Sequence, residues 1–279
     1  MTLVPLSTHA EQTVFSAPDA ELLHTCDARG VHTFTLNRPS GFNVLSDGML
    51  DALLAALAHV AADGRARVVV LAAAGKAFCA GHNLKEMSAY PDQAAHQALF
   101  NKCTKVMLGI QNLGVPVLAR VQGLATAAGC QLVAQCDLAV AVDTAKFGVN
   151  GISIGLFCST PSVPLSRNIP QKRAMEMLLT GQFISAQQAL ADGLINRAVP
   201  AEELDDAVEG FVQAILTKPA EALAMGKQLF YQQRETGIAA AYQLAGQTMA
   251  CNMMLPCTQE GVQAFTEKRT PSWAVPQVG

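Results

Sequence analysis

The chain has 279 residues, of which 51% are hydrophobic and 15% are charged, and its formal net charge is −3. A chain of this length can bury a large core, and so apolar a composition predicts that other subunits cover part of its surface. The slightly negative charge provides no basic surface for a phosphate backbone, which excludes nucleic acid as an expected partner.

The cysteines and the start of the sequence predict a compartment. The eight cysteines contain no Cys-x-x-Cys pair, which is typical of buried free thiols in a reducing environment. The first residues lack the basic and apolar pattern of a secretory signal, and no apolar run is long enough to cross a bilayer. We therefore expect a cytoplasmic protein without a membrane association.

Residues 1–28 show no sustained hydrophobic period, so we expect them to form an N-terminal arm. From residue 29 to about residue 200, apolar runs typical of strands alternate with helical patterns, which predicts one α/β core. Ser46 is expected to cap the first helix of this core. The expected strands cover residues 31–36, 68–71, 116–119, 138–142 and 194–199, and the expected helices cover residues 46–62, 92–113 and 127–135. Residues 76–83 are expected to be a loop.

The segment from residue 149 to about residue 170 contains Gly, Ser and Pro in no regular pattern, so we expect it to be irregular. A helix around residues 175–179 should follow and end at Gly181. Ser185 is then expected to cap a short helix. Beyond Pro200 the pattern is helical throughout, with expected helices at 201–216, 219–234, 238–254 and 258–268. Residues 201–279 should therefore form a helical C-terminal region that packs on the core or on a neighbouring subunit.

Two loops rich in small residues follow buried strands and lead into helices, at residues 77–85 and 121–132. Free N–H groups at the start of a helix favour developing negative charge. Either loop alone could be an ordinary turn between a strand and a helix. Two such loops on neighbouring strands can each direct one N–H at a single oxygen, which is how an oxyanion hole is built.

Several segments resemble the crotonase (enoyl-CoA hydratase/isomerase) family, in that family's order and spacing, between about residues 31 and 269. These segments are FCAGHNLKEM, VQGLATAAGCQLVAQCD, FGVNGISIGL, AMEMLLTGQFISAQQALADGLIN and AFTEKR. The resemblance implies an α/β fold built as a spiral of ββα units, with a helical C-terminal region that forms a homotrimer or a dimer of trimers. It also implies a coenzyme A thioester as substrate or ligand, with no permanently bound cofactor and no metal.

The family's functional positions transfer to this sequence by motif. The two oxyanion N–H groups fall on His82 and Ala128. Lys85 and Lys268 carry point charges that suit a phosphate contact, although either could also be an ordinary solvated lysine. The residues that the resemblance matches to coenzyme A or substrate contacts are His82, Asn83, Leu84, Lys85, Phe265 and Lys268.

The sequence departs from the hydratases at both catalytic glutamates. Gln131 occupies one of these positions and Gly151 occupies the other. An amide cannot exchange protons near neutral pH, and glycine has no side chain. Positioned acid–base groups contribute roughly 10²–10⁴ in rate, so standard hydration should fall to a trace unless another group substitutes. If the pocket keeps its shape, the double variant Gln131→Glu with Gly151→Glu should gain hydratase activity.

Three groups could substitute for the missing pair. His82 lies at the expected oxyanion position and its ordinary pKa of about 6.5 suits proton transfer, although its ring could also point away from the substrate. Asp143 follows a strand and could be a turn residue. The run Cys158-Ser159-Thr160 has no evident base beside it and could cap a helix.

Two functions therefore stay open at this point. One is a lyase or isomerase of fatty acid metabolism that acts on enoyl-CoA with weak or altered activity. The other is a non-catalytic acyl-CoA-binding or assembly protein.

Overall fold

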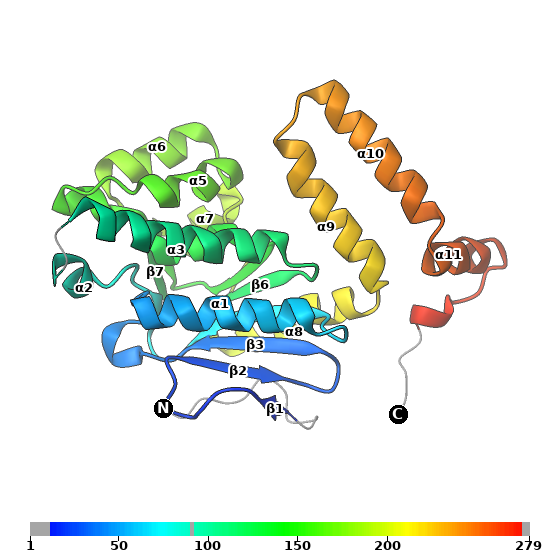
Figure 1. Ribbon diagram of the computed structural model, residues 1–279, viewed down its shortest axis with the longest axis horizontal. Coiled ribbons are helices and arrows are strands. Elements are labelled where there is room, and N and C mark those ends of the chain that lie inside the picture. The colour runs from blue at the N-terminus through cyan, green and yellow to red at the C-terminus, as the bar shows by residue number, and fades with distance from the viewer. Residues whose placement is uncertain (1–11, 90–91, 275–279) are drawn as a thin grey trace.

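The computed structural model describes residues 12–89 and 92–274 (Figure 1). Its strands form two sheets. The larger sheet has the order β1 (Thr13–Val14), β2 (Leu22–Cys26), β3 (Val31–Leu36), β4 (Val68–Ala73), β6 (Val117–Val121), β8 (Leu138–Val142), β11 (Arg197–Val199). The smaller sheet has the order β10 (Ile184–Ser185), β9 (Lys146–Gly148), β7 (Leu124–Thr126), β5 (Ala77–Cys79).

The central strands β3, β4, β6, β8 and β11 of the larger sheet are parallel, whereas β1 and β2 are antiparallel to their neighbours. Every residue of β4 is buried, which is typical of a parallel strand with both faces covered. Strands β4, β6 and β8 are each followed by a short strand of the smaller sheet, β5, β7 and β9 respectively, and then by a helical segment. This repeat is the expected spiral of ββα units, and the predicted α/β fold is confirmed.

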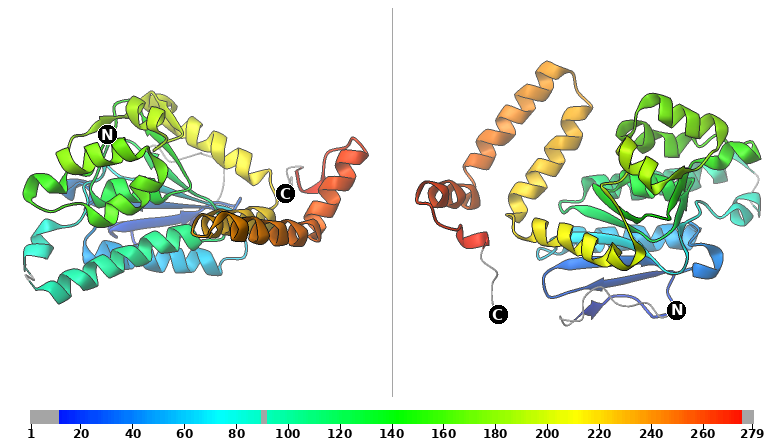
Figure 2. Two further views of the ribbon diagram at one scale, coloured as in Figure 1. Left: turned by 90° about the horizontal axis from the view of Figure 1, so that it is seen from above. Right: turned by 180° about the vertical axis from the view of Figure 1, so that it is seen from behind.

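The helices cover the sheets and form most of the C-terminal part of the chain. They are α1 (Asp47–Ala62), α2 (Leu84–Ala89), α3 (Gln93–Asn112), α4 (Ala128–Gln135), α5 (Ser159–Asn168), α6 (Gln171–Thr180), α7 (Ala186–Asp192), α8 (Leu204–Leu216), α9 (Ala220–Arg234), α10 (Ile238–Met253) and α11 (Pro256–Thr266). The 3₁₀ turns are η1 (Pro39–Gly41), η2 (Asn150–Ile154), η3 (Ala201–Glu203) and η4 (Ser272–Ala274). Helices α10 and α11 extend away from the sheets in every view (Figure 2).

The two predicted N-caps are confirmed. The Ser46 hydroxyl accepts a hydrogen bond from the N–H of Met49 at 3.0 Å, and the Ser185 hydroxyl accepts one from the N–H of Gln188 at 3.2 Å. Gly181 ends α6 in the left-handed conformation, as its position after the apolar pattern predicts.

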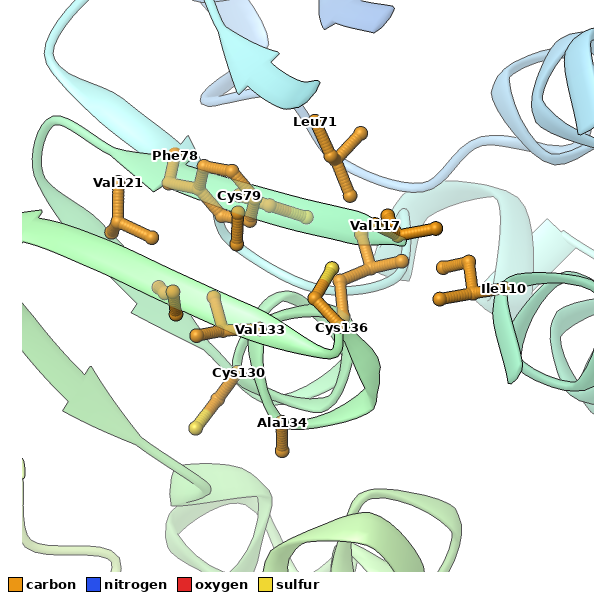
Figure 3. Packing of buried hydrophobic residues seen from close by; sticks show 14 of the residues in the cluster. Leu71, Phe78, Cys79, Ile110, Val117, Val121, Cys130, Val133, Ala134 and Cys136 are labelled. Carbon is orange, nitrogen blue, oxygen red and sulfur yellow. The ribbon is translucent and has the colours of Figure 1, made fainter. Parts of the chain in front are cut away.

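The core lies where β4, β6 and the short strand β5 meet α4. Leu71, Phe78, Val117 and Val133 come from these four elements and pack against one another (Figure 3). All residues of α4 are buried. A β-carbon added to Gly129 would lie 2.1 Å from the carbonyl oxygen of Cys79, so only glycine lets α4 approach β5 this closely.

The expectation of an arm without regular structure is wrong for residues 22–26, which form β2. Leu22, His24 and Cys26 all point inward and are buried. A buried histidine in the middle of this set hides the apolar alternation by which a strand is identified. Residues 1–11 of the expected arm and residues 275–279 of the expected C-terminal region lie outside the described residues.

Two further expectations need correction. The expected loop at 76–83 contains β5, because a strand of three residues is too short to show a period. The segment at 149–170, expected to be irregular, contains η2 and the ten-residue helix α5. Pro161 lies in the first turn of α5, where an N–H has no partner inside the helix, so proline is tolerated there. Pro164 lies inside the helix and is buried, so tertiary packing overrides its tendency to break the helix.

The prediction that the cysteines are buried is wrong for two of them. Cys251 on α10 is exposed and Cys257 on α11 is half-buried, because these helices make few contacts with the core of their own chain. The remaining cysteines are buried, and all are free. Within the described ranges, no helix combines the length and the apolar character that a membrane span requires.

Candidate functional site

A cavity of about 290 Å³ lies between the two small-residue loops on one side and η2 and α5 on the other. Its walls are mostly apolar, as small-molecule sites generally are. Of the residues expected at the site, His82, Leu84, Ala128 and Gly151 line this cavity. Cys158, Ser159 and Thr160, considered as substitute acid–base groups, also line it. The structure thus brings together residues that lie up to 78 positions apart along the chain.

The two small-residue loops touch each other at Gly81. This glycine has a φ of +91°, and a β-carbon at this position would lie 2.9 Å from the β-carbon of Ala127 and 3.3 Å from the backbone nitrogen of Ala128. A larger residue would therefore push the loops apart and would also strain the backbone. Glycine at position 81 keeps the backbone next to His82 close to the backbone at Ala128.

Ala127 holds the second loop in an uncommon conformation, with φ 50° and ψ −121°. L-residues seldom adopt a positive φ, and such strain is concentrated at functional sites. Two hydrogen bonds hold it there: the N–H of Ala127 donates to the Gly148 carbonyl at 2.9 Å, and its carbonyl accepts from the N–H of Gln131 at 3.0 Å. These bonds fix the peptide between Ala127 and Ala128, and therefore the direction of the Ala128 N–H.

The backbone N–H groups of His82 and Ala128 make no backbone hydrogen bond within residues 12–89 and 92–274. Ala128 is the first residue of α4, where an N–H has no partner inside the helix. Both residues line the cavity. Two free donors that lie on touching loops are suited to hold one oxygen atom of a ligand.

The His82 imidazole lies against Phe100, with the ring centroids 5.7 Å apart in an edge-to-face arrangement. Both ring nitrogens are buried and have no hydrogen-bond partner among the described residues. Burial lowers the pKa of His82, because the charged form loses its hydration. The ring at the cavity wall is therefore neutral at physiological pH.

Gly151 lies in a crowded turn. A β-carbon added here would lie 2.4 Å from the carbonyl oxygen of Leu156 and 2.9 Å from the sulfur of Cys158. The N–H of Gly151 donates to that sulfur at 3.3 Å. The turn as folded therefore has no room for a β-carbon at this position, and a glutamate here would require the turn to move; the activity of the double variant stays a prediction.

The remaining candidate acid–base groups are poorly suited to proton transfer. Burial raises the pKa of the Cys158 thiol, which disfavours the thiolate. The Ser159 hydroxyl donates to the carbonyl of Phe157 at 3.3 Å. Asp143 follows β8, does not line the cavity, and its N–H donates to the Val199 carbonyl at 2.8 Å. His82 is thus the best placed group for proton transfer near neutral pH.

Gln131 does not line this cavity. Its side chain lines a neighbouring hollow between α3, α4, α5 and α9, and its Oε1 atom is buried without a hydrogen-bond partner among the described residues. Thr160 borders both spaces. Gln131 and Gly151 thus line two adjoining spaces that meet at Thr160.

Of the residues matched to coenzyme A contacts, only some lie at the cavity. Leu84 lines the cavity, and Lys85 is exposed on α2. The Asn83 side chain is engaged with the first turn of α2: its Nδ2 donates to Glu86 at 2.8 Å, and its Oδ1 accepts from the N–H of Lys85 at 3.2 Å.

Phe265 and Lys268 lie at and just beyond the end of α11, which is far from the cavity of the same chain (Figure 2). Phe265 is 85% exposed. The structure of one chain therefore does not bring these two residues to the cavity.

A polar pair in the cavity wall is not predicted from the sequence. The Thr126 hydroxyl donates to Asn150 Oδ1 at 2.6 Å, and both residues line the cavity. Asn150 is the neighbour of Gly151, but no sequence pattern connects it with Thr126, which belongs to another ββα unit.

The fold and the two converging loops define a protein of the crotonase class. The enoyl-CoA hydratase/isomerase family model matches residues 27–276, and the chain belongs to this family. It is similar to the enoyl-CoA hydratase domain-containing protein 3, mitochondrial, of Rattus norvegicus, with 42% identity over 93% of this chain and 87% of the relative. The human protein of that name is also 42% identical, over 88% of this chain and 81% of the relative.

Solved structures agree with this assignment. The crystal structure of an enoyl-CoA hydratase from Mycobacterium smegmatis has a TM-score of 0.90 and 59% identity, and the match covers 91% of this chain and 99% of that chain. The crystal structure of the human domain-containing protein 3 has a TM-score of 0.87 and 42% identity, with coverage of 91% and 100%.

The expected cytoplasmic location is corrected by these comparisons. The relatives from rat, mouse, frog and human are all named as mitochondrial proteins, which contradicts that expectation. Buried free thiols are compatible with more than one reducing compartment, so they do not distinguish the cytoplasm from the mitochondrion.

Proposed function

We propose that this chain binds an acyl-coenzyme A thioester, with the thioester oxygen held between the N–H groups of His82 and Ala128. The contact between the two loops at Gly81 is the observation that carries this proposal, because it keeps the two donors on neighbouring backbones at one cavity. Preorganised N–H donors stabilise the negative charge that develops on such an oxygen. The apolar wall suits the acyl chain.

The chemistry at this site differs from standard hydration. A water molecule that attacks an enoyl thioester needs a positioned base and acid. Gly151 offers neither, and Gln131 lines a different hollow. Proton transfer at the cavity then depends on His82, whose neutral ring can accept a proton at the one nitrogen that carries no hydrogen.

The surroundings of Gly151 and His82 also favour a second function. The turn at Gly151 leaves no space for a carboxylate, and no side chain of the described residues hydrogen-bonds the His82 ring to orient it as a base. A site with oxygen donors but no oriented acid–base group can bind an acyl thioester without converting it. This is the non-catalytic acyl-CoA-binding or assembly protein.

Self-association is part of the proposal. Large apolar side chains on α10 and α11 are more than half exposed in the single chain, and an apolar surface of this kind is typical of subunit interfaces. They are Ile238, Tyr242, Met249 and Phe265. In a homotrimer or a dimer of trimers, Phe265 and Lys268 could contact coenzyme A only in the cavity of another subunit, because α11 lies far from its own cavity.

The oxygen contact can be tested without changing the protein. We expect butyryl-CoA to bind at least about tenfold more tightly than its thioether analogue S-butyl-CoA, because the analogue lacks the carbonyl oxygen and leaves two donors unpaired. Isothermal titration calorimetry measures both affinities. Equal affinities would contradict the proposed position of the thioester.

Turnover separates the two functions. Crotonyl-CoA and longer enoyl-CoA substrates are followed at the enoyl-thioester absorbance, with His82→Gln as the test variant and His96→Gln on α3 as the matched control. Turnover that is lost only in His82→Gln identifies an enzyme that uses this imidazole. Tight binding without hydration, isomerisation or hydrolysis identifies the non-catalytic protein.

A further inference from the structure

A second cluster of reactive side chains lies at the opposite end of α1 from the cavity. Cys26 on β2, His32 on β3 and Asp63 at the end of α1 each offer one ligand atom, and these atoms all lie within 4.8 Å of one another. Cys26 and His32 are directly opposite partners in the antiparallel pairing of β2 with β3, so their side chains are on the same face of the sheet. Both are buried.

We propose that this cluster is a binding site for a divalent zinc-type ion, with Cys26 Sγ, His32 Nε2 and a carboxylate oxygen of Asp63 as ligands. Thiolate, imidazole and carboxylate together form a ligand set that suits Zn²⁺, and the fourth tetrahedral position is open to water. This site is separate from the proposed acyl-CoA function and does not depend on it.

The distances fit a tetrahedral ion. Bond lengths of about 2.0–2.3 Å at the tetrahedral angle place neighbouring ligand atoms roughly 3.3–3.8 Å apart. His32 Nε2 and Asp63 Oδ2 are 3.2 Å apart. The Cys26 sulfur lies within 4.8 Å of the other ligand atoms, so it has to move by up to roughly 1–1.5 Å to complete the set.

His24 supplies the outer contact that metal-ligating histidines usually have. Its Nε2 lies 2.9 Å from His32 Nδ1, and both side chains are buried. A ligating imidazole generally passes its remaining N–H to such a partner, which fixes the ring and its tautomer. Phe15 packs on His24 with 4.6 Å between ring centroids, which places an apolar side chain over this outer contact.

The charges around the cluster favour a cation. Asp63 is the C-cap residue of α1, where the helix dipole is negative. The guanidinium of Arg29 is paired with Asp27 and Glu209. The side chain of Arg65 is 90% exposed and reaches only Asp63 Oδ1, at 3.8 Å. The Oδ2 atom of Asp63 is therefore left to face His32.

Binding of the ion is balanced by the loss of one proton. A zinc–sulfur bond forms as the Cys26 thiol releases its proton to solvent, as metal binding by cysteine requires. Before the ion binds, the Asp63 carboxylate can only accept, so His32 Nε2–H donates to Asp63 Oδ2 and His24 Nε2–H donates to His32 Nδ1. Coordination breaks the bond to Asp63, and both rings change tautomer: each now carries its hydrogen on Nδ1, and His32 Nδ1–H donates to His24 Nε2. Each of the two imidazoles keeps a single proton throughout.

The site does not belong to the acyl-CoA cavity. His82 pairs with Leu45 just before the first turn of α1, whereas Asp63 follows its last turn. The helix has 16 residues and is about 24 Å long. The ion would join β2, β3 and the end of α1, and its expected effect is therefore on stability.

Cobalt titration of the untagged, chelator-treated full chain tests the proposal. We expect one equivalent of Co²⁺ per chain to give the intense visible absorption of a four-coordinate ion and a thiolate-to-cobalt charge-transfer band. Added Zn²⁺ should displace it and raise the melting temperature by about 5 °C at a hundredfold excess over Kd.

Two variants and a matched control make the result specific. Cys26→Ser should abolish the charge-transfer band, Asp63→Asn should weaken binding at least about tenfold, and Cys251→Ser, which removes an exposed thiol on α10, should bind like the original chain. A charge-transfer band that survives in Cys26→Ser would overturn the proposal. The proposal would also be overturned if the original chain did not bind one equivalent of Co²⁺. This measurement decides the question even if a variant does not fold.

Discussion

The crowding at Gly151 leads to a quantitative prediction for Gly151→Ala. The added β-carbon would lie 2.4 Å from the backbone oxygen of Leu156, about 1 Å closer than ordinary van der Waals contact allows. The turn cannot absorb this easily, because the N–H of Leu156 donates to the Gly151 carbonyl at 3.0 Å and ties the same two residues together. Overpacking of this kind costs about 1–3 kcal/mol in the free energy of unfolding.

In urea denaturation this cost appears as a lower midpoint urea concentration, while the slope of the unfolding free energy against urea concentration stays the same. Gly226→Ala is the matched control, because it lies inside α9 with nothing within 4 Å of the added carbon. This control should raise the free energy of unfolding by about 0.5–1 kcal/mol, since alanine favours the helix. The two variants make the same chemical change and should shift stability in opposite directions.

A second variant distinguishes the two contacts at this turn. Adding Cys158→Ala to Gly151→Ala removes the sulfur at 2.9 Å but leaves the Leu156 carbonyl in place. We therefore expect little recovery of stability. Gly151→Ala with a free energy of unfolding within about 0.5 kcal/mol of the original would refute the account of the crowded turn, and with it the reason why a glutamate does not fit.

Four other outcomes are expected. Gln131→Glu alone should leave hydration of crotonyl-CoA at a trace, because this side chain lines the neighbouring hollow; a gain of a hundredfold or more in initial rate would show that it reaches the substrate. Gly81→Ala should weaken butyryl-CoA binding by about tenfold or more, because the β-carbon separates the two loops; unchanged calorimetric affinity would contradict this. Burial lowers the pKa of His82, so below about pH 6.5 the unfolded chain binds a proton that the folded chain does not. Stability should therefore fall as the pH falls through that range, and His82→Leu should flatten the fall in thermal melts; an unaltered pH profile would argue against it. Tyr242→Glu on α10 should reduce self-association in sedimentation experiments, whereas Gln243→Glu, an exposed polar neighbour, should not; equal behaviour would remove α10 from the interface.

The sequence alone determined the features that depend on local pattern. The strand at residues 31–36 and the buried strand that begins at residue 68 follow from alternation and from a continuous apolar run. The caps at Ser46 and Ser185 follow from side-chain chemistry within three residues of the helix start. The family followed from motifs that keep their order along the chain.

Only the tertiary structure decided how distant residues meet. The crowding of Gly151 depends on the path of the chain through Leu156, and the orientation of Gln131 depends on how α4 packs. Strand β2 could not be predicted from the sequence, because the buried polar residue His24 interrupts its apolar alternation. The cluster of Cys26, His32 and Asp63 joins two strands and a helix end. Periodicity records which face of an element is apolar, whereas sites and packing depend on contacts between elements, and no local pattern contains those distances.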